Sequence, residues 1–194
     1  MMTSTTLTVD ERRTLLRLAR ETVAQTACQQ AVTVRVEDYS PALQAWGASF
    51  VTLTTADGDL RGCIGALEAY QPLVQDVCEH AAAAASEDYR FYPVRPEEVD
   101  ELHIEISILT APQMLDYSDG ADLAARLRPG VDGVILWDGG RRATFLPQVW
   151  EKLPDPGEFL SHLCMKMGAP ADAWRRRKMR VGVYQVEEFH EGQI

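Results

Sequence analysis

The chain has 194 residues, of which 46% are hydrophobic and 25% are charged, as is ordinary for a soluble globular protein with one sizeable core. Its formal net charge of -10 argues against general binding to nucleic acids or to anionic membrane surfaces. No apolar run approaches the roughly 20 residues of a membrane span, and residues 1–6 carry no signal-peptide pattern. Four cysteines without CxxC spacing predict reduced thiols and a cytoplasmic protein: Cys28, Cys63, Cys78 and Cys164.

The chain opens with a predicted helix. Thr8 and Glu11 fit a capping box, in which each side chain accepts a hydrogen bond from the other residue's backbone. An apolar stripe continues the helix to about Cys28. Residues 32–48 have weak periodicity and are predicted to form a connector that crosses the surface.

A β-hairpin and a second helix are expected next. Residues 49–55 and 60–67 fit two strands, joined by Asp57-Gly58, a dipeptide typical of tight hairpin turns. Pro72 suits the first turn of a helix, because its missing N–H would have no partner there. That helix is expected to end at about Ser86.

A loop and a further strand follow. Residues 88–94 combine aromatic side chains, an arginine and a proline, and they are predicted to form a loop. Residues 102–109 alternate as a strand, with the isoleucines facing the core and with His103, Glu105 and Ser107 on the opposite face. This polar row lacks a recognisable pair of nucleophile and base, so a face turned to solvent is the favoured interpretation.

The second half of the chain predicts a short helix, a second hairpin, another helix and a last strand. These elements are expected over residues 121–127, 133–137 with 142–146, 156–168 and 181–186. The two hairpins make the fold class α+β, with a largely antiparallel sheet flanked by helices. The basic run 175–178 is predicted as a solvated helix end, with an anion site as the less favoured alternative.

The stretch Leu60–Gly65 is unusual for a packed strand, because two glycines weaken it and leave little to bury. Glycine in a strand often marks the close approach of a ligand or of another backbone. Alternation places Arg61, Cys63 and Gly65 on one face, so a guanidinium and a thiol lie about 7 Å apart along the strand. We expect this face to be the site.

The chemistry of the stretch leaves alternatives open. Cys63 is either a nucleophile or covalent carrier, its thiolate favoured by Arg61, or a small buried hydrophobic residue. Arg61 either holds an anionic ligand or forms a structural ion pair with Glu105, which is slightly favoured. Arg90 either pairs with Asp88 or reaches the site.

Six blocks of sequence together resemble one family, and they run in order over nearly the whole chain. The blocks are FVTL (50–53), LRGCIG (60–65), RFYPV (90–94), IEISIL (104–109), LPQVW (146–150) and FLSHLC (159–164). The family is the AMMECR1 domain family, whose prokaryotic form is called AmmeMemoRadiSam system protein A. The resemblance implies one AMMECR1-type domain over residues 1–194, with an α+β fold, a larger and a smaller lobe, and the RGCIG motif near the cleft between them.

The expected site combines the residue chemistry with the resemblance. Cys63 is the expected catalytic residue, and the expected ligand-binding residues are Arg61, Gly62, Gly65, Arg90, Glu105 and Gln148. The scattered histidines and cysteines predict no metal site, and the turn glycines predict no nucleotide cofactor.

The resemblance also implies two partners, because prokaryotic members are encoded with a Memo-family protein and a radical SAM enzyme. It implies no established reaction. We therefore expect a component of a multi-protein modification pathway, whose own catalytic status and oligomeric state are left open. The alternative is a non-catalytic binding or adaptor module in which RGCIG is structural.

Overall fold

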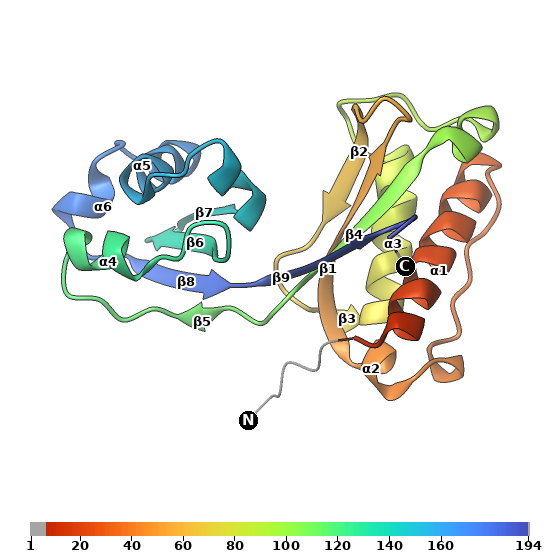
Figure 1. Cartoon of the computed structure of the whole chain (residues 1–194), viewed down its shortest axis with the longest axis horizontal. Helices are drawn as coiled ribbons and strands as arrows, with labels where there is room; N and C mark the ends of the chain where they lie inside the picture. Colours follow the sequence, from red (N-terminus) through yellow and green to blue (C-terminus); the bar gives the residue numbers. More distant parts are fainter. Residues whose placement is uncertain (1–6, 194) are drawn as a thin grey trace. The chain divides into compact units, whose positions relative to one another are not determined.

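The structure, a computed structural model, describes residues 7–193. The predicted lack of a signal peptide concerns residues 1–6, which lie outside the described residues. The chain divides into two compact units (Figure 1). The first runs to Leu109 and resumes at Glu187, and the second comprises Thr110–Val186. The second unit is therefore an insertion between two strands of the first.

The helices and strands of the first unit are α1 (Val9–Ala27), η1 (Val36–Asp38), α2 (Pro41–Gln44), β1 (Trp46–Thr54), β2 (Leu60–Gly65), β3 (Gln71–Pro72), α3 (Leu73–Ser86), η2 (Pro96–Glu101), β4 (His103–Leu109) and β9 (Val186–His190), where η marks a 3₁₀ helix. Those of the second unit are β5 (Gln113–Met114), α4 (Gly120–Arg126), β6 (Gly133–Asp138), β7 (Arg141–Phe145), η3 (Pro147–Glu151), α5 (Pro156–Lys166), α6 (Ala173–Arg176) and β8 (Arg180–Tyr184).

The sheet of the first unit has the strand order β2-β1-β4-β9, and β3 adds two residues at the start of β1. β1 is antiparallel to both β2 and β4. Helices α1 and α3 pack on one face of this sheet (Figure 1). Their apolar stripes bury Leu15, Val77 and Ala81 against Val51 and Ile104. The opposite face of the sheet carries the more polar side chains.

The residues predicted to begin the first helix and to form the first hairpin turn do so in the structure. The Thr8 amide donates to the Glu11 carboxylate at 2.8 Å, and the Glu11 amide donates to the Thr8 hydroxyl at 3.3 Å. The β1–β2 turn holds Gly58 at a φ of 85°, a left-handed conformation that glycine adopts without strain. Both the capping box and the hairpin are therefore confirmed.

The second unit has its own sheet, ordered β5-β8-β6-β7, and its own core. Helices α4, α5 and α6 pack against this core. Trp150 stacks on Phe159 with 3.7 Å between ring centroids. Helix α5 ends as predicted, because Gly168 adopts a φ of 75° just after its last turn.

Three expectations need correction. Residues 32–48 are more than a connector, because they contain η1 and α2 and because β1 already begins at Trp46. The last strand does not run over 181–186: β8 ends at Tyr184, and β9 pairs within the other sheet. The strands form two sheets rather than one.

The α+β class itself is confirmed, since helices pack on antiparallel strands in both units. Among residues 7–193, no helix is both long and apolar enough to cross a membrane.

Candidate functional site

β2 lies so close to α3 that residue 62 has no room for a side chain. A Cβ atom on Gly62 would stand 2.2 Å from the carbonyl oxygen of Ala84 in α3. The close approach expected from this glycine is therefore real, and the approaching group is a helix backbone. Because side chains alternate along a strand, Cys63 points to the other face of the sheet, away from α3. Its thiol is half-buried there and forms no disulfide.

Cys63, Thr52 and Glu105 form one row across three neighbouring strands. Thr52 of β1 pairs with Cys63 of β2 on one side and with Glu105 of β4 on the other. The Thr52 hydroxyl donates to the Cys63 Sγ at 3.4 Å. The thiol therefore has a polar neighbour on its own sheet face, which argues against a purely apolar role.

The backbone of Cys63 is fixed at the outer edge of the sheet. β2 is an edge strand, so the N–H and C=O groups on its outer side have no neighbouring strand to pair with. The Asp88 carboxylate accepts the Cys63 N–H at 2.9 Å, and the Arg90 guanidinium donates to the Cys63 carbonyl at 3.4 Å. Asp88 and Arg90 thus take the place of a further strand.

Asp88 and Arg90 also form an ion pair, which was one of the two alternatives that the sequence left open for Arg90. Arg90 donates to both carboxylate oxygens of Asp88, at 2.8 and 2.6 Å. The Asp88 side chain is only 2% exposed. The Arg90 hydrogen bond, with help from the Cys63 amide, holds the pKa of Asp88 well below its usual range.

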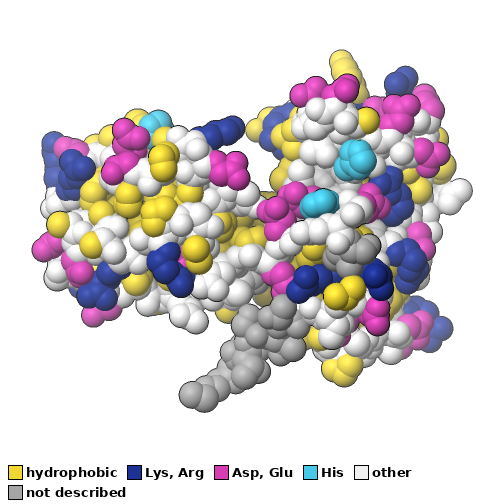
Figure 2. All heavy atoms as spheres, in the orientation of Figure 1, with side chains coloured by type: hydrophobic (Ala, Val, Ile, Leu, Met, Phe, Trp, Pro, Cys, Tyr) yellow, Lys and Arg dark blue, Asp and Glu magenta, His cyan; other side chains and the backbone are white. Residues whose placement is uncertain are grey.

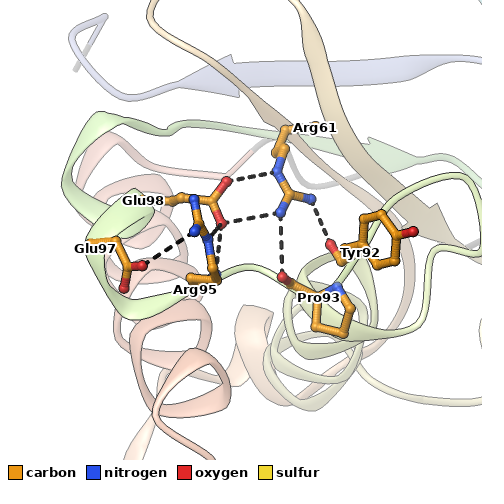
Figure 3. Close-up of polar contacts among 6 residues, drawn as sticks. All are labelled: Arg61, Tyr92, Pro93, Arg95, Glu97 and Glu98. Atoms are coloured by element: carbon orange, nitrogen blue, oxygen red, sulfur yellow. Dashed lines mark hydrogen bonds and ion pairs between the residues drawn. The ribbon is translucent and has the colours of Figure 1, made fainter.

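Arg61 makes a second fixed cluster (Figure 3). Its Nε donates to the Glu98 carboxylate at 3.1 Å, and its Nη1 donates to the Tyr92 carbonyl at 2.9 Å. Its Nη2 donates to the Pro93 carbonyl and to Glu98. This pairing corrects the expected partner, which was Glu105. It also lowers the pKa of Glu98 to about 2, chiefly through the Arg61 hydrogen bond.

The strand register explains why Arg61 does not meet Glu105, because Glu105 lies in the row of Cys63 and Arg61 lies two residues further along β2. Gly62 pairs with Leu53, but the next pair along the ladder joins Leu60 to Thr54, so Arg61 is left without a partner in β1. Such a bulge interrupts the alternation on which the expectation depended. Leu60, at this irregular end of β2, is 40% exposed.

Glu105 has different surroundings from those expected. Its side chain lies half-buried on the sheet face opposite Ile104 and Ile106. Burial raises its pKa, the negative charge of Glu188 raises it further, and His190 acts in the opposite direction. Glu105 therefore holds a proton more readily than an ordinary glutamate.

The remaining expected site residues are placed as follows. A Cβ on Gly65 would stand 2.3 Å from the Phe50 ring, so this glycine makes room for an aromatic side chain. Gln148 lies in η3 of the second unit. The roles of Cys63 in catalysis and of the other residues in ligand binding stay predictions. Among residues 7–193, no group of three or more His, Cys, Asp or Glu side chains is arranged to hold a metal ion.

Three residues of this site were not predicted from the sequence. The contact of Thr52 with Cys63 could have been found from the hairpin register, because the Asp57-Gly58 turn largely determines which residues of the two strands pair. Asp88 was considered only as a partner of Arg90. Glu98 gives no local signal, because its contact with Arg61 joins residues 37 positions apart.

Comparisons with known proteins settle the family. The profile of the AMMECR1 family matches residues 16–189. The chain belongs to the AMMECR1 family. The resemblance carried by the RGCIG and LPQV blocks is thereby confirmed.

Relatives match the chain along most of its length. A protein of Methanothermobacter thermautotrophicus is 40% identical over 188 residues, covering 95% of this chain and 96% of that protein. Protein MK0488 of Methanopyrus kandleri is 35% identical over 192 residues, covering 95% and 90%. The crystal structure of PH0010 from Pyrococcus horikoshii, titled as an uncharacterized protein, has a TM-score of 0.81 and 32% identity and covers 92% and 90% of the two chains.

Proposed function

We propose that this AMMECR1-family chain is a component of a multi-protein modification pathway that works with a Memo-family protein and a radical SAM enzyme. In this proposal the polar sheet face around Cys63 receives a substrate or a modified group. The partners rest on the family resemblance, since prokaryotic members are encoded with them. The place of contact rests on the geometry of the first sheet.

One observation carries the proposal: a half-buried thiol is held in a fixed position on the sheet face opposite α3. Asp88 and Arg90 fix the Cys63 backbone from outside, and Thr52 donates to its sulfur. Binding and covalent sites need such preorganised side chains on rigid elements. A cysteine that served only to fill the core would face α3 instead.

The experiment compares thiol labelling of the chain alone and with its partners. Full-length tagged protein is treated with iodoacetamide, and each cysteine is followed by mass spectrometry. Cys78 and Cys164 are buried, so only Cys28 and Cys63 should react in the free protein. With the Memo-family protein and the radical SAM enzyme added, we expect labelling at Cys63 to fall.

Cys28 is the internal control, because it is exposed and lies at the end of α1 rather than on the sheet face. Its labelling should not change on addition of the partners. Failure of both partners to co-purify with the chain, together with unchanged labelling at Cys63, would reject the proposal.

The second candidate function is a non-catalytic binding or adaptor module, and the loop 88–94 favours it. Arg61 fixes this loop through the carbonyls of Tyr92 and Pro93. The side chains of Tyr89 and Tyr92 are nevertheless almost wholly exposed, at 95% and 90%. Exposed tyrosines on a fixed loop are typical of protein interfaces.

The two functions differ in what they require of the thiol. A Cys63→Ala variant that binds its partners normally, combined with loss of binding in Tyr89→Ala and Tyr92→Ala, would favour the adaptor. Loss of the Cys63-dependent modification with binding intact would favour a substrate-contacting site.

A further inference from the structure

The second unit contains a hollow that the proposed function does not use. It measures about 630 Å³, within the range of small-molecule sites. Its apolar lining comes from Ala121 and Ala124 of α4, Pro156 of α5 and Trp174 of α6. Arg175 lies at the same hollow and belongs to the basic run 175–178.

Arg175 differs from the other three members of this run. Arg176 pairs with Asp172, Arg177 pairs with Asp138, and Lys178 pairs with Asp116. Pairing of this kind is common over the protein surface, where acidic and basic side chains lie next to one another (Figure 2). The Arg175 guanidinium instead lies over the Trp174 ring, 4.5 Å from its centroid, and makes no ion pair with any of residues 7–193.

Gly157 lies beside two opposite charges that line the hollow. A Cβ atom on Gly157 would stand 3.0 Å from the Asp155 Oδ1 and 3.2 Å from the Arg175 Nη2. The two charged side chains therefore both lie next to Gly157 in the hollow, and no ion pair joins them. Asp155 Oδ1 accepts the Glu158 amide at 2.9 Å, which fixes the carboxylate, while its Oδ2 makes no hydrogen bond within residues 7–193.

We propose that this hollow binds an α-amino acid, with the ligand's carboxylate on Arg175 and its ammonium on Asp155. An α-amino acid carries its ammonium and its carboxylate on one carbon atom, which suits two opposite protein charges that lie beside the same residue of one hollow. The planar guanidinium suits a carboxylate and is already held flat by Trp174. The alanines and the proline offer an apolar surface to an aliphatic side chain.

The experiment is an NMR titration of the full-length protein with L-leucine. The reporter is the indole N–H of Trp174, which donates to the Ser161 hydroxyl at 3.1 Å and so has a defined position. We expect a saturable shift of this resonance. Two matched probes each lack one charge: 3-methylbutylamine has no carboxylate, and 4-methylpentanoate has no ammonium. Each should bind about tenfold or more weakly than leucine.

Two variants test the assigned residues against a matched control. Arg175→Gln and Asp155→Asn should each weaken leucine binding by about tenfold or more. Asparagine is itself a good helix cap, so Asp155→Asn leaves the start of α5 intact. Arg176→Gln removes a charge from the same run but from a paired arginine, and it should bind leucine like the natural protein.

Three results would overturn the proposal. They are the lack of any saturable shift with leucine, binding of either single-charge probe as tight as that of leucine, and an equal loss in Arg176→Gln and Arg175→Gln. None of these depends on Cys63 or on the first unit, so the proposed function would stand or fall separately.

Discussion

Asp88 and Cys63 are joined across the outer edge of β2, where the aspartate Oδ2 accepts the Cys63 amide at 2.9 Å. The carboxylate accepts the hydrogen bond that a neighbouring strand would otherwise accept at this edge. An open edge is also a hazard, because another chain can pair with it. The same contact therefore fixes the RGCIG backbone at Cys63 and blocks pairing of another chain with the middle of β2.

We predict that Asp88→Ala lowers the free energy of unfolding by about 2–3 kcal/mol, because it leaves the Cys63 amide and the Arg90 guanidinium without their partner. Urea unfolding measures the effect. Asp116→Ala is the control, since that side chain is 99% exposed, and it should change the free energy by less than about 0.5 kcal/mol. Equal effects of the two substitutions would show that the Asp88 contact contributes little.

Arg61 and Glu98 should be strongly coupled. Their side chains are only 14% and 25% exposed, and the arginine donates through both Nε and Nη2. A double-mutant cycle with Arg61→Gln and Glu98→Gln should give a coupling energy of about 1–3 kcal/mol. The same cycle on Arg17 and Glu21, an exposed pair of α1, should give about 0.3–0.5 kcal/mol. Similar values for the two pairs would contradict the structural role assigned to Arg61.

The same pair predicts how stability depends on pH. Arg61 lowers the folded-state pKa of Glu98 to about 2, whereas an unfolded glutamate titrates near 4.3. Below about pH 4.5 the unfolded chain therefore binds more protons, and stability falls as the pH drops toward 2. Glu98→Gln should be less stable than the natural protein by on the order of 2 kcal/mol at pH 7. Unfolding curves measured down to pH 2.5 should show this difference shrinking, and a constant difference would reject the assignment.

Gly62 is predicted to tolerate no side chain. Gly62→Ala would place a Cβ 2.2 Å from the Ala84 carbonyl oxygen, so β2 or α3 must move. We expect a loss of about 2 kcal/mol or more in unfolding free energy, and a larger loss for Gly62→Val. Gly140→Ala is the control, because no atom lies within 4 Å of its added Cβ. Thermal unfolding compares the three variants, and equal melting temperatures would argue against close packing at position 62.

Much of the fold could be predicted because its signals are local. The capping box at Thr8, the turn at Asp57-Gly58 and the helix end at Gly168 each depend on a few neighbouring residues. The break between β8 and β9 gave no such signal. It falls at Gln185, a single polar residue in an apolar run, with no glycine or proline at the break itself. Which sheet a strand joins is decided by distant partners, so two sheets could not be told from one.

The candidate site shows the same division. Alternation correctly turned Cys63 away from the packed glycine, since this requires only the geometry of one strand. The partner of Arg61 depended on the register of three strands and on a bulge, neither of which carries a clear mark in the sequence. Asp88 and Glu98 reach β2 from a loop and a 3₁₀ helix, so only the folded chain brings them there.

Glu105 offers the sharpest test of the sheet face that carries Cys63. Burial and the Glu188 charge raise its folded-state pKa, so the folded protein binds a proton more readily than the unfolded chain in the range just above pH 4.5. The ionised carboxylate then opposes folding at neutral pH, and this cost disappears in acid. Glu105→Gln should therefore be more stable than the natural protein at pH 7 and indistinguishable from it near pH 3.5.

Urea unfolding at the two pH values gives the stability difference, and carbon NMR of the Glu105 carboxyl follows its titration directly. Glu188→Gln is the matched variant: it removes a charge that raises the pKa of Glu105, so the Glu105 titration should move to lower pH. A Glu105→Gln protein that is less stable at pH 7 would mean that the carboxylate makes a favourable contact in the folded state. In that case the ionised Glu105 would stabilise β4, and the assignment of a raised pKa to this residue beside Cys63 would be wrong.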